Sequence, residues 1–136
     1  MCGRYALFSK DKIKNKLNID IKVNYNISPS IDVLVLNNNF DPRMMKWGIS
    51  PVWSKNKLNI INARSETMHN KSSFKNAFKC IFIADGYYEW KKDNGYKRPY
   101  YLYLKSSFLY FAGIYDGFSR CCIVTTKSEP SISHIH

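Results

Sequence analysis

The second residue of this 136-residue chain, Cys2, carries the most chemistry of the opening stretch MCGRY. Methionine aminopeptidases remove Met1 when the next side chain is as small as cysteine. The product carries an α-amine and a thiol on one residue, which titrate near ~8 and ~8.5, so both have nucleophilic forms at neutral pH. An aldehyde forms an imine with such an amine, and the thiol then closes a five-membered thiazolidine. An N-terminal Cys2 therefore predicts covalent capture of aldehydes.

The neighbours of Cys2 suit a ligand that carries phosphate. Gly3 allows close approach of the backbone to a ligand. Arg4 supplies a guanidinium, which binds phosphate through two parallel hydrogen bonds, two residues from the thiol. On its own, a cysteine beside a chain end is more often incidental, because chain ends fray. The assignment therefore depends on the rest of the chain.

Two stretches in the middle of the chain add groups that could serve this chemistry. In INARSET, residues 61–67, Asn62, Arg64 and Glu66 alternate and would share one face of an extended segment. In ADGYYEW, residues 84–90, Glu89 lies between aromatic residues. A carboxylate desolvated by aromatic neighbours holds its proton more readily, which suits a proton shuttle. The alternative for Glu89 is an ordinary surface glutamate on an amphipathic strand.

The chain is strongly basic, with 21 Lys and Arg against 10 Asp and Glu and a formal charge of +11, which favours polyanions and nucleic acid above all. A compositional origin stays open, since an AT-rich genome would also produce many lysines and asparagines. The sequence shows neither a signal peptide nor an apolar run of about 18 residues, which predicts an intracellular protein. The four cysteines lack the spacing of a zinc site or a disulfide framework: Cys2, Cys80, Cys121 and Cys122.

Strands must supply most of the framework that positions these residues. A helix is expected at residues 10–17, and short helical turns are expected at 63–69 and 74–78. A turn signal at Asp93-Asn94-Gly95 separates two aromatic strands. The other expected strands are 32–36 and 43–47, joined by a turn at 37–41, and 80–84, 108–115 and 121–126. The predicted class is therefore α+β with a largely antiparallel sheet.

Seven short motifs occur in order along the chain: MCGRY (1–5), YNISP (25–29), KWGISPVW (46–53), NARSET (62–67), DGYYEW (85–90), FAGIYD (111–116) and IVTT (123–126). Together they closely resemble the SRAP family, the SOS-response-associated peptidase domain. The resemblance implies one domain over residues 1–136, a mostly antiparallel sheet or open barrel with a few short helices. It also implies that the C-terminal part of the family domain is missing, because family members continue beyond this point.

The resemblance further implies binding of single-stranded DNA and capture of the ring-opened aldehyde of abasic sites, as a thiazolidine DNA–protein crosslink through Cys2. Asn62 would hydrogen-bond near the linkage, and Glu89 would handle protons. His136 matches the family's histidine, whereas His134 is out of phase with it. The residues expected to contact DNA are Arg4 and Arg64 at the flanking phosphates, and Pro29 with a tryptophan of residues 47–53, Trp47 or Trp53, along the channel.

Neither a metal nor a cofactor is expected, and abasic single-stranded DNA is the expected partner of a monomeric protein in the cytoplasm, or in the nucleus of a eukaryote. Autopeptidase and lyase activities belong to the same expectation. Two alternatives stay open. Cys2 and Glu89 could serve only to cleave off Met1, as in an N-terminal-nucleophile cysteine peptidase. The lysines and aromatic residues could instead bind single strands without covalent capture.

Overall fold

Strands dominate the structure, a computed structural model that describes residues 2–130 and 132–135. Among these residues the longest helix has 8 residues, and no helix is long and apolar enough to cross a membrane. In chain order, with 3-10 helices labelled η, the elements are β1 (Tyr5–Leu7), α1 (Lys10–Leu17), β2 (Asn24–Ile27), β3 (Asp32–Leu36), β4 (Pro42–Trp47), β5 (Asn62–Arg64), η1 (Met68–Asn70), η2 (Ser72–Phe74), β6 (Phe78–Ala84), β7 (Gly86–Asp93), β8 (Tyr96–Tyr103), β9 (Leu109–Tyr115), β10 (Arg120–Thr125) and η3 (Ser133–Ile135).

One sheet closes into a barrel with the strand order β4-β3-β6-β9-β10. Neighbours in this order pair antiparallel, and β10 then returns to pair parallel with β4, so that Cys121 lies opposite Trp47. β5 pairs with the other end of β10, also parallel, with Ile123 opposite Asn62. The α+β class and the mostly antiparallel barrel are confirmed, and the two short parallel pairings complete it.

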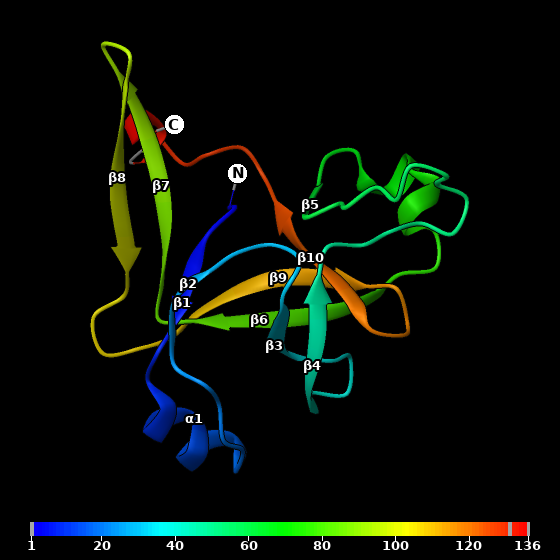
Figure 1. Ribbon diagram of the computed structural model, residues 1–136, viewed down its shortest axis with the longest axis horizontal. Helices are drawn as coiled ribbons and strands as arrows, with labels where there is room; N and C mark the ends of the chain where they lie inside the picture. The colour runs from blue at the N-terminus through cyan, green and yellow to red at the C-terminus, as the bar shows by residue number, and fades with distance from the viewer. Residues whose placement is uncertain (1, 131, 136) are drawn as a thin grey trace.

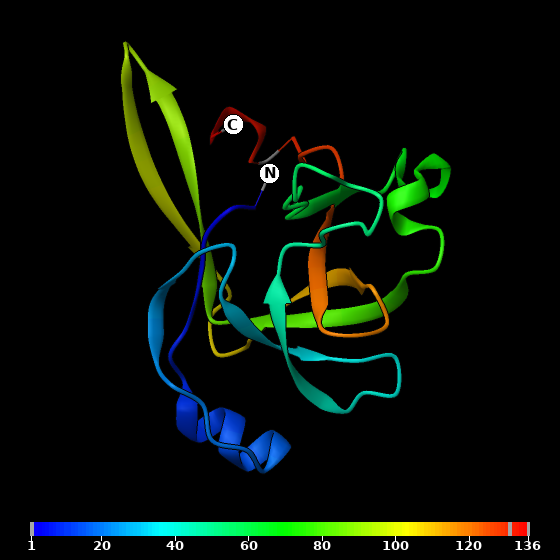
Figure 2. The ribbon, with the colours of Figure 1, turned by 45° about the vertical axis from the view of Figure 1, so that its right-hand side comes forward.

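The second sheet is antiparallel, with the order β2-β1-β7-β8. Its β7–β8 hairpin projects from the body of the molecule (Figure 1). The N-terminal segment before β1 lies between this hairpin and β5, and η3 lies there too, next to β7 (Figures 1 and 2). The two sheets therefore meet at the first residues of the chain.

Asp85, at the corner between β6 and β7, holds the far end of β1 in place. Its carboxylate accepts hydrogen bonds from the backbone N–H groups of Phe8 at 2.6 Å and Ser9 at 2.9 Å, and from the Ser9 hydroxyl. Its own backbone N–H donates to the Ala6 carbonyl at 2.8 Å. Because β1 is tied to this corner, the residues that precede it are held against β7.

The core between the sheets is built on three aromatic side chains, Tyr5, Trp47 and Phe82, each with 0% exposure. The ring centroids of Tyr5 and Trp47 are 5.4 Å apart, and those of Trp47 and Phe82 are 6.3 Å apart. The Trp47 Nε1–H donates to the Ile61 carbonyl at 3.0 Å, which satisfies its polar group. Trp47 was the wrong choice for the DNA channel, because a fully buried indole cannot stack on a base.

Replacing Trp47 by alanine is expected to lower the free energy of unfolding by about 3–5 kcal/mol, because it leaves a large cavity where the indole packs against Tyr5 and Phe82. Trp53, which is 59% exposed, is the matched control, and Trp53→Ala is expected to change stability by less than about 0.5 kcal/mol. Urea unfolding of both variants measures the difference. Equal small effects would contradict this assignment of Trp47 to the core.

Local signals predicted several elements correctly and one helical turn incorrectly. α1 has the expected bounds, and Asn94 and Gly95, with φ angles of 44° and 85°, form the turn between β7 and β8. The helical turn expected at 63–69 is wrong at its start. Residues 62–64 form strand β5, which pairs with β10, and the 3-10 turn begins only at Met68. The turn expected at 74–78 is present over Phe74–Ala77, where the Ala77 N–H donates to the Phe74 carbonyl at 3.1 Å, and β6 begins at Phe78.

Candidate active site

Cys2 is buried within the fold and does not lie at a frayed chain end. Its side chain is only 7% exposed, and its Sγ lies 3.9 Å from the Arg4 carbonyl oxygen. The same carbonyl accepts a hydrogen bond from the Tyr88 N–H at 2.9 Å, and Tyr5 lies opposite Tyr87. The pairing of β1 with β7 therefore continues to the residues beside Cys2 and brings it next to the strand that carries Glu89.

Asn62 contacts Cys2 from the opposite side. Its Nδ2 donates a hydrogen bond to the Cys2 carbonyl oxygen at 3.0 Å, across 60 residues of sequence. Its Oδ1 is buried and has no hydrogen-bond partner in the described part of the chain. A buried acceptor left in this state costs about 1–3 kcal/mol. The site therefore holds a fixed acceptor next to Cys2, ready for a donor on a bound molecule.

Glu89 lies close enough to Cys2 to act on it electrostatically. Burial raises the pKa of the Cys2 thiol to about 12, and the negative charge of Glu89 adds to the rise. Burial also raises the pKa of Tyr87, again with contributions from Glu89 and Cys2. In the chain that still carries Met1, the thiol is thus held in its protonated form. It requires a base, and Glu89 is the carboxylate beside it.

The buried thiols make alkaline pH destabilising. Burial raises the pKa values of Cys2, Cys80 and Cys122 to about 12, whereas thiols in an unfolded chain ionise near ~8.5. Above that pH the unfolded chain loses protons that the folded chain keeps, so stability falls as pH rises. The free energy of unfolding is expected to fall from about pH 8 to 10, by up to about 1.4 kcal/mol per pH unit for each thiol.

Urea unfolding under reducing conditions measures this dependence, with Cys122→Ala as the comparison. The variant lacks one buried thiol, so its free energy of unfolding should fall less steeply with pH, by the contribution of that one thiol. Stability that stays constant or rises over this pH range would show that these thiols ionise as readily in the fold as outside it.

The two candidate phosphate-binding arginines flank the site. Arg4 donates from Nη1 to the Asn26 Oδ1 at 3.1 Å, while its buried Nε has no partner among the described residues. Arg64 is exposed and follows Asn62 by two residues on β5, so the two share a face as expected. Glu66 lies beyond β5 and accepts hydrogen bonds from the Thr126 hydroxyl and the Lys127 N–H, both at 3.1 Å. Glu66 therefore joins two backbone segments instead of entering the site.

The remaining predicted site residues lie further out or outside the described residues. Pro29 is half-buried in the turn before β3, and Trp53 is exposed on the loop after β4. His136 lies outside the described residues. The segment before it, η3, lies against β7, and within η3 Ile135 is buried whereas His134 is exposed.

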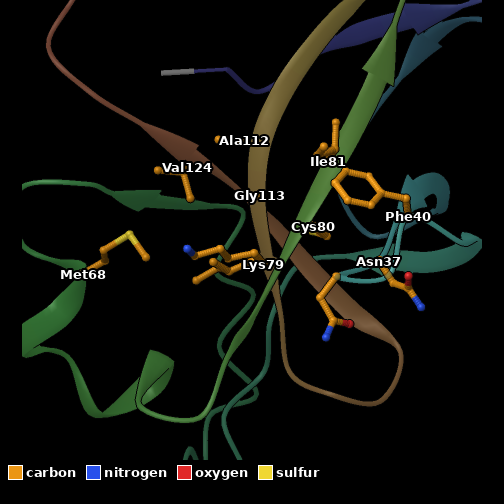
Figure 3. A pocket seen from close by; sticks show the side chains of 11 residues that line it. Asn37, Phe40, Met68, Lys79, Cys80, Ile81, Ala112, Gly113 and Val124 are labelled. Carbon is orange, nitrogen blue, oxygen red and sulfur yellow. The ribbon is translucent and has the colours of Figure 1, made fainter.

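A separate pocket of about 450 Å³ lies on the barrel, between β6, β9 and the turn that joins β3 to β4 (Figure 3). Phe40, Met68 and Ile81 contribute to a largely apolar lining, to which Lys79 adds a charged side chain. No candidate site residue lines this pocket. Cavity size alone would therefore have directed attention away from Cys2.

The arrangement around Cys2 can be compared with known families. All of the chain, residues 1–136, matches the family model described as SOS response associated peptidase (SRAP). The chain belongs to the SRAP family. The resemblance inferred from the seven motifs is thereby confirmed.

Named relatives match the whole chain or part of it. YoqW of Bacillus subtilis (strain 168), named an abasic site processing protein, is 37% identical in an alignment that covers 100% of this chain and 73% of that protein. HMCES of Gallus gallus, with the same descriptive name, is 41% identical in an alignment that covers 43% of this chain and 20% of that protein. A crystal structure of a Bordetella bronchiseptica protein matches with a TM-score of 0.82 at 22% identity, over 99% of this chain and 78% of that one, which supports the fold.

Three residues of this SRAP site were missed in the sequence. Tyr87 lies two residues before Glu89 on the same strand face, and this alternation was visible in DGYYEW. Asn26 fixes Arg4, and Asp85 fixes β1, through contacts between segments far apart in sequence. No local pattern signals these last two, because each depends on the pairing of β1 with its neighbours.

Proposed function

We propose that this chain, once Met1 is removed, binds single-stranded DNA and captures abasic sites covalently as a thiazolidine at Cys2. The observation that carries the proposal is the convergence of Asn62 and Glu89 on Cys2 from two different sheets. The names of the SRAP relatives, which are abasic site processing proteins, support the substrate. An abasic site in its open form offers the aldehyde that an amine and a thiol on one residue can trap.

The reaction balances without an oxidant or a further reactant. The Cys2 amine attacks the aldehyde carbon, and loss of one water gives an imine. The Cys2 Sγ then bonds to the imine carbon, and the thiol proton passes through the Glu89 carboxylate to the nitrogen, which leaves a neutral thiazolidine. The protonated state of the buried thiol gives Glu89 a defined task in this step. Reversal uses the same proton path in the opposite direction.

Asn62 and the arginines have supporting roles in this proposal. The Asn62 Nδ2 holds the Cys2 carbonyl, and its unpartnered Oδ1 is available to an N–H of Cys2 or a hydroxyl of the opened sugar. Arg4 and Arg64 bind phosphates on either side of the lesion, and the exposed Trp53 and half-buried Pro29 contact bases. The formal charge of +11 favours binding to a polyanion.

Denaturing gels test the proposal against its alternatives. The protein is incubated with an abasic single strand and with an undamaged strand of the same sequence. The proposal predicts an SDS-stable shifted band with the abasic strand alone. A protein that only removes its own Met1, or one that only binds single strands non-covalently, would give no such band with either strand.

A further inference from the structure

The buried polar atoms that the fold leaves unsatisfied belong to residues around Cys2. Within residues 2–130 and 132–135, three buried side-chain atoms have no hydrogen-bond partner: the Arg4 Nε, the Tyr5 hydroxyl oxygen and the Asn62 Oδ1. The Arg4 carbonyl oxygen lies 3.9 Å from the Cys2 Sγ, and the Asn62 Nδ2 donates to the Cys2 carbonyl oxygen. The proposed function gives a task to Arg4 and to Asn62, whereas the Tyr5 hydroxyl has none.

Packing does not explain the hydroxyl of Tyr5. The side chain is 0% exposed, and its ring centroid lies 5.4 Å from that of Trp47, 6.4 Å from that of Phe82 and 6.1 Å from that of Phe111. A phenylalanine could make the same ring contacts. The hydroxyl adds the cost of a buried polar group that has lost its hydration and has gained no partner in the described structure. Its presence therefore indicates a role other than packing.

The Tyr5 hydroxyl lies within electrostatic reach of Cys2. Tyr5 follows Cys2 by three residues, and both side chains belong to one core cluster. Burial raises the pKa of the Tyr5 hydroxyl well above its usual value, and charges on Cys121 and Cys2 raise it further. The hydroxyl therefore keeps its proton and can act as a hydrogen-bond donor. Of the two thiols, Cys121 directs its Sγ to the Lys46 carbonyl oxygen at 3.6 Å, and the proposed reaction does not involve it.

The Cys2 sulfur needs a new hydrogen-bond partner during the proposed reaction. As a thiol it is a weak donor, and its Sγ lies 3.9 Å from the Arg4 carbonyl oxygen. Ring closure passes the thiol proton through Glu89, so the sulfur can no longer donate to that carbonyl. Until it bonds to the imine carbon, the sulfur carries negative charge and becomes an acceptor. A donor fixed beside it stabilises this state, because hydrogen bonds to charged groups are the stronger kind.

We infer that the Tyr5 hydroxyl donates a hydrogen bond to the Cys2 sulfur while the thiazolidine ring closes and opens. The inference rests on the proposed function, which supplies the reaction. No proton leaves Tyr5, so the thiol proton still reaches the nitrogen through Glu89 and the balance of the reaction is unchanged. Formation of the imine does not involve the sulfur and therefore does not depend on Tyr5.

The test compares two tyrosines that each lose only a hydroxyl. Tyr5→Phe removes the proposed donor, and Tyr115→Phe is the matched control. Tyr115 is 9% exposed, and its hydroxyl donates to the Asn38 Oδ1 at 2.6 Å. Tyr115 lies four residues beyond Phe111 on β9, or about 13 Å along the strand from the residue that the Tyr5 ring contacts.

Each full-length protein, with Met1 removed, reacts with an abasic single strand under single-turnover conditions, and samples are denatured in SDS with and without borohydride. Tyr5→Phe is expected to slow ring closure about 10- to 100-fold, the effect of losing one hydrogen bond to a charged group. The imine, which survives SDS only after borohydride, should form at the wild-type rate and accumulate before the stable crosslink appears. The urea midpoint of this variant should stay the same or rise, because the lost hydroxyl has no partner in the described fold.

The control should show the opposite pattern. Tyr115→Phe is expected to lower the urea midpoint, because it removes the hydrogen bond to Asn38, and to leave the rates of both steps unchanged. Unchanged ring closure in Tyr5→Phe, without accumulation of the imine, would overturn the inference. Equal slowing of both steps together with a lower urea midpoint would also overturn it, because the hydroxyl would then serve the fold. A wild-type protein that gives no SDS-stable crosslink would reject the proposed function itself, whereas a wild-type crosslink with an unaffected Tyr5→Phe variant would reject the role of Tyr5 alone.

Discussion

Cys2→Ala, with Met1 removed, is expected to lose all SDS-stable capture of an abasic single strand. The variant keeps the α-amine, so it can form an imine, which hydrolyses in SDS and heat but is trapped by borohydride. It lacks the Sγ that closes the ring. The substitution removes a small side chain at the edge of the core, so the fold is retained. Denaturing gels with and without borohydride separate the two kinds of product.

A second alteration of the same residue tests the amine. A tag that blocks the N-terminus leaves the Cys2 thiol in place but converts the amine into an amide, and it too should abolish stable capture. Both proteins should still bind undamaged single strands, since Arg4 and Arg64 are unchanged. A stable crosslink from either one without borohydride would contradict ring closure through both groups.

Glu89→Gln is expected to slow formation or reversal of the crosslink by tens to thousands of fold, which overlaps the factor of about 100 to 10,000 that a positioned general acid or base typically contributes. The substitution keeps the size of the side chain and removes the carboxylate that acts on the Cys2 thiol. Affinity for undamaged DNA should change little, or rise slightly because one negative charge is lost. Single-turnover time courses on denaturing gels measure both directions.

Asp93→Asn is the matched control for this variant. Asp93 lies on the same strand and the same face as Glu89 but at the end of the hairpin, next to the turn. The Asp93→Asn substitution removes the same charge at a position that is not next to Cys2. Rates that fall equally in the two variants would show that general charge, instead of proton transfer by Glu89, controls the reaction.

The sequence predicted those elements whose signals are local. α1 lies at the predicted residues because the segment lacks helix breakers and places Ile13, a core residue, and Leu17 four apart. The β7–β8 turn was readable because Asn94 and Gly95 tolerate the positive φ angles that a two-residue hairpin loop requires. The family resemblance, carried by seven motifs, predicted the barrel that local patterns could not assemble.

The wrong predictions concern residues whose state depends on distant partners. Residues 62–64 form a strand because they pair with β10, 61 residues further along the chain. The alternation of Asn62 and Arg64 allowed an extended segment, but only this distant pairing excludes the competing helical turn. Trp47 looked like Trp53 in the sequence, but it is buried by contacts with Tyr5 and Phe82 from other strands. The raised pKa of Cys2 has the same origin, because burial by the surrounding fold causes it.

Intact-mass spectrometry, before and after incubation with an abasic oligonucleotide, tests the central claim most directly. Before incubation the protein is expected to lack the mass of Met1. After incubation it should gain the mass of the oligonucleotide less one water, since imine formation releases one water and thiazolidine closure releases none. A covalent adduct on protein that still carries Met1, or a processed protein whose mass does not change with the abasic strand, would contradict capture by the amine and thiol of Cys2.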